Sequence, residues 1–363
     1  MLNAPTQALA AGDRAPNFVL PDANGKFSMF YDRVVGKPTA LLFAPALQPP
    51  VLPSALLGFE SKADAFEALG VDVFCVSTST KEAVEAMSPR MHLWADPEQK
   101  ITQAYMQQLG QAKAPTGGRV VAALLDANQR LLALMDGDSD DLAERALAFY
   151  QSRPALPPRQ VRRATAPVLI IPNLLDPPMC QALMDLFDNG KVEEGAVGSV
   201  IAGKEVERLH HEKKKRLDHK IEDPEMNKLL QQIIGRRIMA ELSKSSHFGG
   251  FRFDRFLVCR YAADREDRFR THRDNISPET ADRKFAMTLN LNGDEYEGGG
   301  LVFPEYGPDE YKPGNGGAVV FSCSLLHEAL PVTKGVRYAL LTFLRQPQPQ
   351  QPQKRPIPAL ARR

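Results

Sequence analysis

Apolar residues in the first part of the chain follow two patterns that alternate along it. Some form short continuous runs, which favour buried strands, and others recur every three or four residues, which favours helices. The expected strands are residues 39–43, 71–76 and 119–125, and the expected helices are residues 56–69, 81–87 and 99–108. Strands that alternate with helices predict an α/β fold for this part of the chain.

The pattern changes in the second half of the chain. Residues 151–166 are rich in proline and arginine and poor in apolar side chains, which is typical of a semi-rigid linker. A strand is expected next at residues 168–171, followed by helices at 176–187 and 224–242. Further strands are expected at residues 256–261, 269–274, 285–291, 300–303, 317–322 and 336–344. This series predicts a double-stranded β-helix, or jelly roll, that encloses a ligand pocket.

With 363 residues, the chain is long enough to bury two separate cores. We therefore expect a two-domain protein that combines an α/β domain with an α+β domain. The expected division is a flexible tail at 1–11, the α/β domain at 12–150, the linker at 151–166, the jelly-roll domain at 167–346 and a disordered tail rich in Pro, Gln and Arg at 347–363.

The overall charge gives no reason to expect nucleic acid or a membrane surface as a partner, because 45 basic residues are balanced by 44 acidic ones. The 4 cysteines are far apart and lie mostly in apolar runs, so we expect reduced, buried thiols. No signal-peptide pattern opens the chain, and no apolar run approaches the roughly 20 residues that cross a bilayer. These features predict a cytoplasmic protein.

Candidate chemistry is concentrated around His272 and Asp274. Side chains two residues apart on a strand point to the same face, so this pair can present an imidazole and a carboxylate together. His327 follows a later apolar strand and would complete the facial arrangement of non-haem Fe(II) sites. Arg337 begins the next strand, among inward-facing apolar residues, where an unpaired charge is costly and an anionic partner is expected. The alternatives without a ligand are that His272 and Asp274 belong to a solvated loop, and that Arg337 forms a structural salt bridge.

A longer motif supports the metal hypothesis. Residues 298–304 read Gly-Gly-Gly-Leu-Val-Phe-Pro, and residues 327–337 read His-Glu-Ala-Leu-Pro-Val-Thr-Lys-Gly-Val-Arg. Together with His-x-Asp, this stretch resembles the Fe(II)/2-oxoglutarate oxygenases of the prolyl 4-hydroxylase type, over most of residues 168–344. The resemblance implies O2-dependent hydroxylation of an unactivated C–H bond in a protein, peptide or small molecule, while 2-oxoglutarate is converted to succinate.

The resemblance also implies roles for individual residues. His272, Asp274 and His327 would hold Fe(II), and Arg337 would bind 2-oxoglutarate with the help of the Tyr261 hydroxyl. O2 would be the second co-substrate, and ascorbate would serve as a reductant. The family usually has a second tyrosine three residues before the first histidine, where this chain has phenylalanine.

The first domain resembles a second family. Residues 13–25 and the strand that ends at Pro45 are similar to the opening of a peroxiredoxin, a thioredoxin-like fold, and the likeness covers residues 11–145. That family has Pro-x-x-x-Thr/Ser-x-x-Cys at its peroxidatic site, whereas here Pro49 and Leu52 replace the hydroxyl residue and the cysteine. Leucine cannot form the thiolate nucleophile, and Cys75 is expected in the core. The domain is left with scaffolding, substrate docking or formation of a homodimer.

Some points stay open from the sequence. Residues 190–218 are polar and punctuated by glycine, and they read either as a mobile lid over the metal site or as a solvated loop. Their basic run at 213–216 is usually a solvated feature. The histidines of this region are not expected to bind metal: His210, His211 and His219. Two other functions compete with the oxygenase, namely a non-catalytic module that senses 2-oxoglutarate or oxygen, and a thiol peroxidase.

Overall fold

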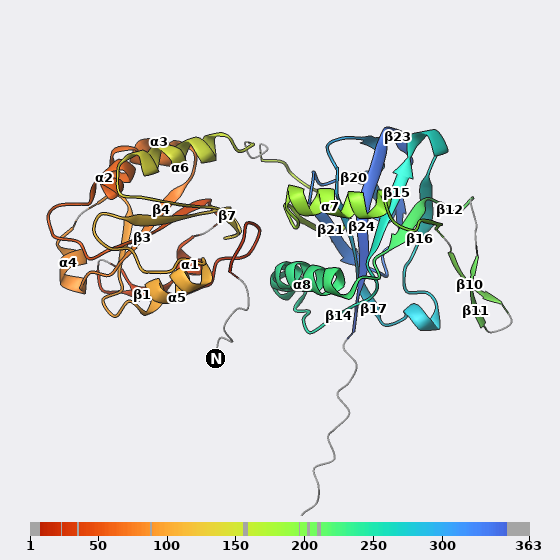
Figure 1. The fold of residues 1–363 in the computed structure, drawn as a ribbon, viewed down its shortest axis with the longest axis horizontal. Coiled ribbons are helices and arrows are strands. Elements are labelled where there is room, and N and C mark those ends of the chain that lie inside the picture. The colour runs from red at the N-terminus through yellow and green to blue at the C-terminus, as the bar shows by residue number, and fades with distance from the viewer. Residues whose placement is uncertain are drawn as a thin grey trace, which may run out of the picture. The chain divides into compact units, whose positions relative to one another are not determined.

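The computed structural model describes residues 8–346 except 23, 35, 88, 155–158, 196, 202–203 and 209–211, and within 197–208 it describes the backbone alone. The chain divides after Val161 into two compact units, each of which is described here by itself (Figure 1). This division falls inside the predicted linker. The predicted tail at 347–363 and most of the predicted tail at 1–11 lie outside the described residues.

The N-terminal unit is built on a five-stranded sheet in the order β5-β4-β3-β6-β7. The strands β3, β4 and β5 run parallel, and β6 and β7 are antiparallel to their neighbours. Their bounds are β3 Thr39–Ala44, β4 Asp72–Ser77, β5 His92–Ala95, β6 Val120–Leu125 and β7 Leu131–Gly137. A separate hairpin is formed by β1 Val19–Pro21 and β2 Phe27–Met29.

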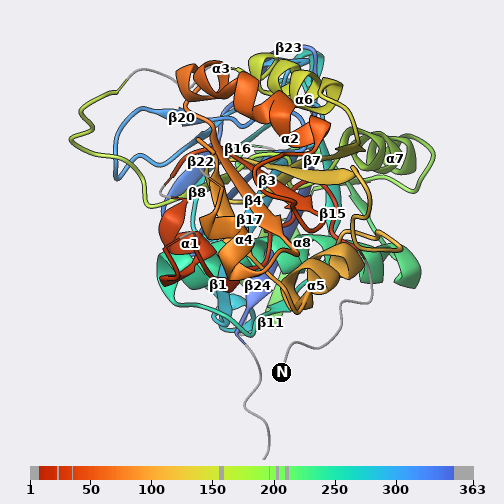
Figure 2. The ribbon, with the colours of Figure 1, turned by 90° about the vertical axis from the view of Figure 1, so that its left-hand side faces the viewer.

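Helices cover both faces of this sheet (Figure 2). Those that pack in one core are α2 Ser54–Ser61, α3 Ala63–Ala68, α4 Lys81–Glu85 and α6 Asp141–Gln151, and those of the opposite core are α1 Phe30–Arg33 and α5 Lys100–Gln108. This is the predicted α/β layer fold, of the thioredoxin type. The helix expected at residues 56–69 is in fact two helices, because the backbone at Lys62 (φ −104°, ψ 11°) ends α2 and starts α3.

The C-terminal unit has two sheets that form the jelly roll. The larger sheet has the order β8-β21-β17-β24-β15-β13-β9, and the smaller has the order β12-β16-β22-β19-β20. The larger sheet contains β8 Leu169–Ile171, β9 Glu193–Glu194, β13 Leu217–Lys220, β15 Leu257–Ala262, β17 Arg283–Asn290, β21 Ala318–Ser322 and β24 Val336–Arg345, with β14 Arg252–Phe253 paired to β24. The smaller contains β12 Lys214–Lys215, β16 Arg268–His272, β19 Leu301–Val302, β20 Glu310–Tyr311 and β22 His327–Ala329.

Two antiparallel pairs of strands lie outside these sheets: β10 Val197–Ile201 with β11 Lys204–Arg208, and β18 Glu297–Gly298 with β23 Val332–Lys334. The described part of residues 190–218 therefore contains strands β9 to β13, and the expectation of a structureless loop was wrong there. Whether this region acts as a lid stays a prediction.

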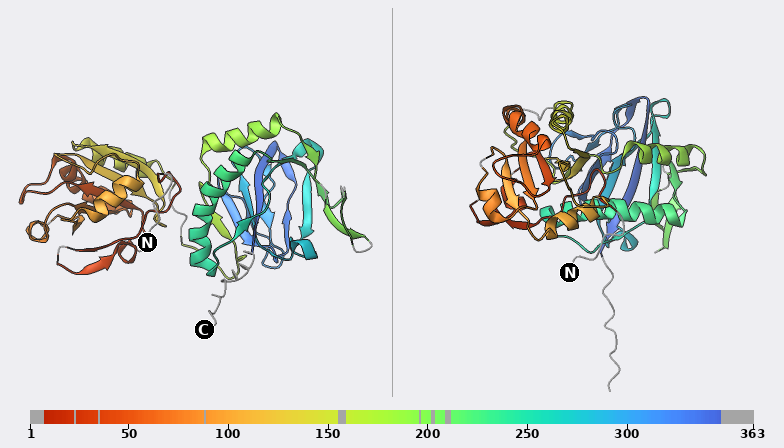
Figure 3. Two further views of the ribbon diagram at one scale, coloured as in Figure 1. Left: turned by 60° about the horizontal axis from the view of Figure 1, so that its bottom comes forward. Right: turned by 60° about the vertical axis from the view of Figure 1, so that its left-hand side comes forward.

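Helices α7 Pro177–Asp188 and α8 Pro224–Ser246 lie against one side of the larger sheet, where they appear in green in Figure 3. The start of α8 is set locally, since the Asp223 carboxylate accepts hydrogen bonds from the N–H groups of Glu225 and Met226, and Pro224 occupies the first turn. Within the described residues, no helix is long and apolar enough to cross a membrane.

Strand β24 shows how this arrangement positions the site. Leu340 and Leu344 pack in the core beneath the helices, whereas Leu341 and Phe343 pack in the core between the two sheets. Successive side chains alternate between the two faces of a strand, so Arg337 belongs to the face that looks into the jelly roll. The inward direction predicted for Arg337 is what the structure shows, because only 3% of this residue is exposed.

Candidate metal centre

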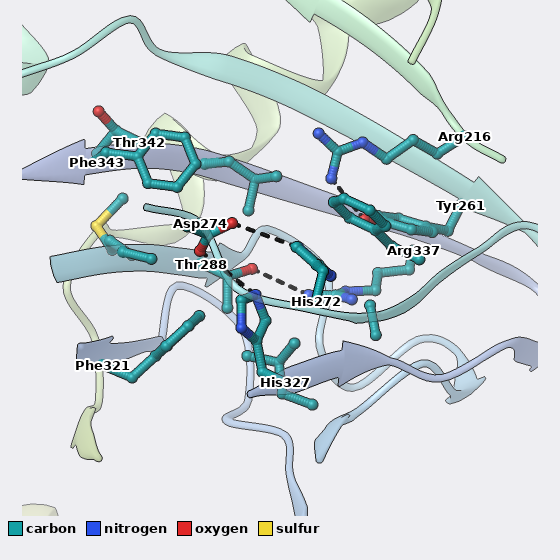
Figure 4. Close-up of a pocket in the computed structure, with 16 residues that line it drawn as sticks. Arg216, Tyr261, His272, Asp274, Thr288, Phe321, His327, Arg337, Thr342 and Phe343 are labelled. Atoms are coloured by element: carbon teal, nitrogen blue, oxygen red, sulfur yellow. Dashed lines mark hydrogen bonds and ion pairs between the residues drawn. The ribbon is translucent and has the colours of Figure 1, made fainter. Parts of the chain in front are cut away.

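Three side chains meet inside the jelly roll, between its two sheets (Figure 4). His272 ends β16 and lies directly opposite His327, which begins β22. One ligand atom from each histidine and one from Asp274 all lie within 4.8 Å of one another. In the described part of the chain, this is the one group of three His, Cys, Asp or Glu side chains that comes together in this way.

Asp274 reaches the group by a different route from the one expected. Strand β16 ends at His272, so the alternation of a strand does not orient the aspartate. Instead, the N–H of Asp274 donates a hydrogen bond to the carbonyl of Cys323 (3.0 Å), just after β21. The pairing of the imidazole and the carboxylate is as predicted, but its cause is a tertiary contact.

The two imidazole rings are held in one tautomer. Nδ1 of His272 lies 2.8 Å from the carbonyl oxygen of Arg270, and Nδ1 of His327 lies 3.0 Å from that of Leu325. A carbonyl oxygen only accepts, so each Nδ1 carries the proton and each Nε2 keeps its lone pair. These Nε2 atoms lie 3.3 Å and 3.4 Å from the two carboxylate oxygens of Asp274. Lone pairs that converge in this way fit a cation between them, as in metal sites whose histidines are oriented by backbone carbonyls.

Burial and neighbouring groups keep Asp274 and His327 in the protonation states that metal ligands need. Burial acts to raise the pKa of Asp274, but the neighbouring His272 and His327 and the charge of Arg283 outweigh burial, and the pKa is lowered. Burial lowers the pKa of His327. At neutral pH the carboxylate is therefore ionised and the His327 imidazole is neutral.

Arg337 forms the other polar end of the cavity. Its Nε donates to Asn290 Oδ1 (3.3 Å), and its Nη2 donates to Thr288 Oγ1 (3.1 Å). Its guanidinium lies 5.2 Å from the centre of the Tyr261 ring. All these partners are neutral, and among the described residues no carboxylate pairs with Arg337. A buried guanidinium without an anion is costly, so this end of the cavity is suited to an anionic ligand.

The glycines of the 298–304 motif allow Arg337 to lie where it does. Gly299 has φ +68°, and a Cβ at this position would lie 3.3 Å from Cδ of Arg337 and 3.0 Å from the Tyr296 ring. Gly298 has φ +71°, and a Cβ there would lie 2.6 Å from the carbonyl oxygen of Pro331. Only glycine tolerates both the positive φ and the close approach.

Apolar side chains complete the cavity. The ring of Phe269, which replaces the tyrosine usual in the resembling family, stacks on His272 with 3.6 Å between the ring centres. The ring of Phe321 lies 4.6 Å from that of His327. Other apolar residues that line it are Ala286, Met287, Leu301, Ala329, Leu341 and Phe343. The cavity thus has one end suited to a cation and one end suited to an anion, with apolar side chains between them.

Sequence reasoning missed Arg216, which also lines this cavity. The run at 213–216 was expected to be solvated, yet Lys214 is 7% and Arg216 only 4% exposed. Both pair with Asp218, at 3.2 Å from Lys214 Nζ and 2.7 Å from Arg216 Nε. These three residues are spaced by two, the period of a strand, and that spacing was the signal that could have identified them.

The N-terminal unit has no comparable site at the position where its resembling family carries the cysteine. Leu52 is 8% exposed and packs in the core with helix α2. Cys75 is fully buried, and burial raises the pKa of its thiol to about 12. All four cysteines are free and buried, as predicted. The Trp94 side chain is buried in the core, and the His92 ring stacks on Phe74.

Comparisons with known proteins give one family match in each of the two units. Residues 256–345 match the model of the 2OG-Fe(II) oxygenase superfamily, and residues 11–121 match that of the AhpC/TSA family. The oxygenase match lies within the unit with the jelly-roll fold, and the AhpC/TSA match lies within the unit with the thioredoxin fold. The oxygenase family implies Fe(II), 2-oxoglutarate and O2.

Curated relatives match a short part of the chain. Procollagen-lysine,2-oxoglutarate 5-dioxygenase 1 of Mus musculus is 33% identical over 110 residues, which is 29% of this chain and 14% of the relative. The multifunctional procollagen lysine hydroxylase and glycosyltransferase LH3 of Rattus norvegicus is 36% identical over 92 residues, which is 24% of this chain and 12% of the relative.

Two solved structures are similar to parts of the chain. The viral collagen prolyl hydroxylase of Paramecium Bursaria Chlorella virus-1, a 2OG complex, is 17% identical with a TM-score of 0.37, and the match covers 49% of this chain and 95% of that one. Peroxidoxin BcpB of Mycobacterium tuberculosis is 19% identical with a TM-score of 0.34, and the match covers 40% of this chain and 97% of that one.

Proposed function

We propose that this protein is an Fe(II)- and 2-oxoglutarate-dependent dioxygenase that hydroxylates an unactivated C–H bond, in the manner of prolyl hydroxylases. The observation that carries the proposal is the cavity itself. At one end, His272, Asp274 and His327 converge three ligand atoms within 4.8 Å of one another. At the other end, Arg337 is buried without an anionic partner among the described residues. Few other functions need both features in one pocket.

Each residue has a defined task in this proposal. His272, Asp274 and His327 would hold Fe(II) on one side and leave its other positions open. Arg337 would pair with the distal carboxylate of 2-oxoglutarate, and its hydrogen bonds to Thr288 and Asn290 hold the guanidinium in place for that pairing. When bound, iron together with 2-oxoglutarate and O2 supplies the oxidising power for hydroxylation, with release of succinate and CO2.

The apolar wall of the cavity supports a reaction that takes place away from water. Phe321, Leu341 and Phe343 line the wall between its polar ends. A dry wall strengthens the pairing between Arg337 and a carboxylate, because the local dielectric constant is low. It also protects a reactive centre from side reactions with solvent.

The substrate is a peptide, a protein side chain such as proline, or a small molecule, and we include ascorbate as the reductant that keeps the iron ferrous. The buried, unpaired cysteines support a reducing compartment, so we propose a cytoplasmic location. The AhpC/TSA domain, whose Leu52 position carries no nucleophile, is proposed to act as a scaffold or to join two copies of the chain.

The function is tested by succinate release. Purified protein with Fe(II), 2-oxoglutarate and air would be incubated with proline- and lysine-containing peptides and with a panel of metabolites. We expect slow succinate formation alone and faster formation with a true substrate, matched mole for mole by a product 16 Da heavier, as the stoichiometry of hydroxylation requires. Asp274→Ala is the control that should form none. Protein that binds 2-oxoglutarate but never forms succinate would be a sensor and not an enzyme.

A further inference from the structure

Arg216 occupies a special position in the jelly roll, between its two sheets. The chain leaves the smaller sheet at β12, which pairs with β16, and enters the larger sheet at β13, which pairs with β15. Arg216 is the single residue between these strands. Strand β16 carries His272 and strand β15 carries Tyr261. Arg216 therefore lies beside both β16, which carries a histidine of the metal group, and β15, which carries the tyrosine near Arg337.

The contacts of Arg216 lead to Tyr261. Its Nη1 donates a hydrogen bond to the Tyr261 hydroxyl oxygen at 2.7 Å, and Figure 4 shows the two side chains meeting at the cavity wall. Its Nε lies 2.7 Å from Oδ1 of Asp218, and its Nη2 donates to Oδ2 at 3.2 Å. The guanidinium also lies 5.7 Å from the centre of the Phe269 ring. Arg216 is thus fixed on two sides, by a carboxylate and by a phenol.

Arg216 differs from Arg337 because it has a carboxylate partner, Asp218. Burial acts to raise the pKa of Asp218, but Arg216 and Lys214 outweigh it and lower the pKa to about 2, so the carboxylate is ionised at neutral pH. Arg216 therefore has an ionised carboxylate as a direct partner, which it shares with Lys214, whereas no described carboxylate pairs with Arg337. An anion entering the cavity is directed to Arg337, and Arg216 is left to act on its neighbour.

The hydrogen bond from Arg216 decides what the Tyr261 hydroxyl can do. A guanidinium only donates, so the phenol oxygen must be the acceptor. The hydroxyl then has its own proton to give, and no described residue accepts it. Burial raises the pKa of Tyr261 despite the nearby guanidinium of Arg216, so the proton stays on the phenol at neutral pH. Tyr261 is therefore an oriented donor, 3% exposed, that needs an acceptor from a ligand.

We propose that Arg216 is a positioning residue that holds the Tyr261 hydroxyl with its proton directed at 2-oxoglutarate. This inference rests on the proposed function, since the acceptor is the co-substrate. Asp218 in turn holds the Arg216 fork in the geometry that reaches Tyr261. Arg216 acts through Tyr261 and touches neither the iron nor 2-oxoglutarate.

A double-mutant cycle tests the proposal. The variants are Arg216→Lys, Tyr261→Phe and the combination, and the readout is anaerobic titration of 2-oxoglutarate into the Fe(II) protein, followed by the visible charge-transfer band of the chelate. Arg216→Lys keeps a cation beside Asp218 but loses the planar fork that reaches two partners at once. We expect it to weaken 2-oxoglutarate binding about threefold to tenfold, the range of one hydrogen bond, with iron affinity unchanged.

The decisive result is the combination. In the Tyr261→Phe background, Arg216→Lys should weaken binding further by less than about twofold, because the hydroxyl through which Arg216 acts is gone. An equal loss in both backgrounds, or no loss in either, overturns the proposal while the oxygenase function stands. Wild-type protein that binds iron but shows no band at any 2-oxoglutarate concentration overturns both. If Arg216→Lys does not fold, Arg216→Gln combined with Asp218→Asn keeps the charge balance and replaces it in the cycle.

Discussion

The two units of this protein both keep a known fold, but they differ at the position where each fold family carries its chemistry. In the N-terminal unit that position is Leu52, a core side chain that is 8% exposed. In the C-terminal unit it is a group of polar side chains that face one another across a cavity, and its two histidines are oriented because they donate hydrogen bonds to the carbonyl oxygens of Arg270 and Leu325. A fold tolerates substitution as long as apolar side chains of suitable size fill its core. A site requires, in addition, that particular polar groups keep their orientation.

Substitution at Leu52 and substitution at Arg337 are therefore expected to change the free energy of unfolding in opposite directions. Removing atoms at Leu52 creates a cavity and destabilises the fold. Replacing Arg337 by an apolar residue of similar size removes an uncompensated buried charge, which is often neutral or stabilising. The first position contributes to stability, and the second carries a cost to stability that a bound anion would offset.

The largest effect is expected from the metal ligands. His272→Ala and Asp274→Ala each remove one of three ligands, so Fe(II) affinity should fall by more than about a hundredfold, beyond the loss caused by removing a mere supporting contact. Iron content after anaerobic dialysis measures this, with circular dichroism to check the fold. Asp264→Ala, at an exposed aspartate, is the matched control and should retain iron. Full iron content in either ligand variant would refute the site.

The next effect concerns Arg337. If it pairs with the distal carboxylate of 2-oxoglutarate, Arg337→Ala should weaken co-substrate binding by about 2–5 kcal/mol, at least tenfold, and leave iron bound. Arg337→Lys should lose less, because the charge survives without the bidentate fork. Anaerobic titration of 2-oxoglutarate measures both variants. An unchanged curve for Arg337→Ala would mean that the co-substrate is anchored elsewhere.

A smaller effect is expected at Leu52, on stability alone. Leu52→Ala should lower the free energy of unfolding of the N-terminal unit by about 2–3 kcal/mol. Trp94 is the single tryptophan of the chain and is buried in that unit, so its fluorescence during urea unfolding reports on that unit directly. Leu57→Ala, on helix α2 five residues after Leu52 and 49% exposed, is the matched control and should change stability by less than about 0.5 kcal/mol. Equal losses for the two variants would place Leu52 outside the core.

The last prediction is that the protein has no peroxidase activity, so the substitution tested here should have no effect. Cys75 has a thiol with a pKa raised to about 12 by burial, so almost no thiolate forms at neutral pH. Peroxide consumption with a dithiol reductant should equal the background and should be the same for Cys75→Ala. Robust turnover that disappears in Cys75→Ala would make the two units alike after all, each with its own chemistry.

Local sequence determined much of this protein. Apolar runs and helical spacing are properties of neighbouring residues, so they predicted β3, β4 and β6, the long strands of the jelly roll and the inward face of Arg337, but they missed β7, α6 and the strands within residues 190–218. Residue type at a motif position was equally informative, because a leucine at position 52 cannot be a nucleophile and two histidines with an aspartate suit a metal.

Tertiary structure alone decided the rest, because it depends on which distant segments pair. Strand β16 ends at His272, and Asp274 is held by the carbonyl of Cys323, far along the chain. The basic run that reads as solvated becomes a strand because Lys214 pairs with Phe269 in the neighbouring strand, and this pairing places Arg216 inside the cavity. A local pattern cannot encode such pairing, since the burial of a charge is set by the partners that long-range contacts bring to it.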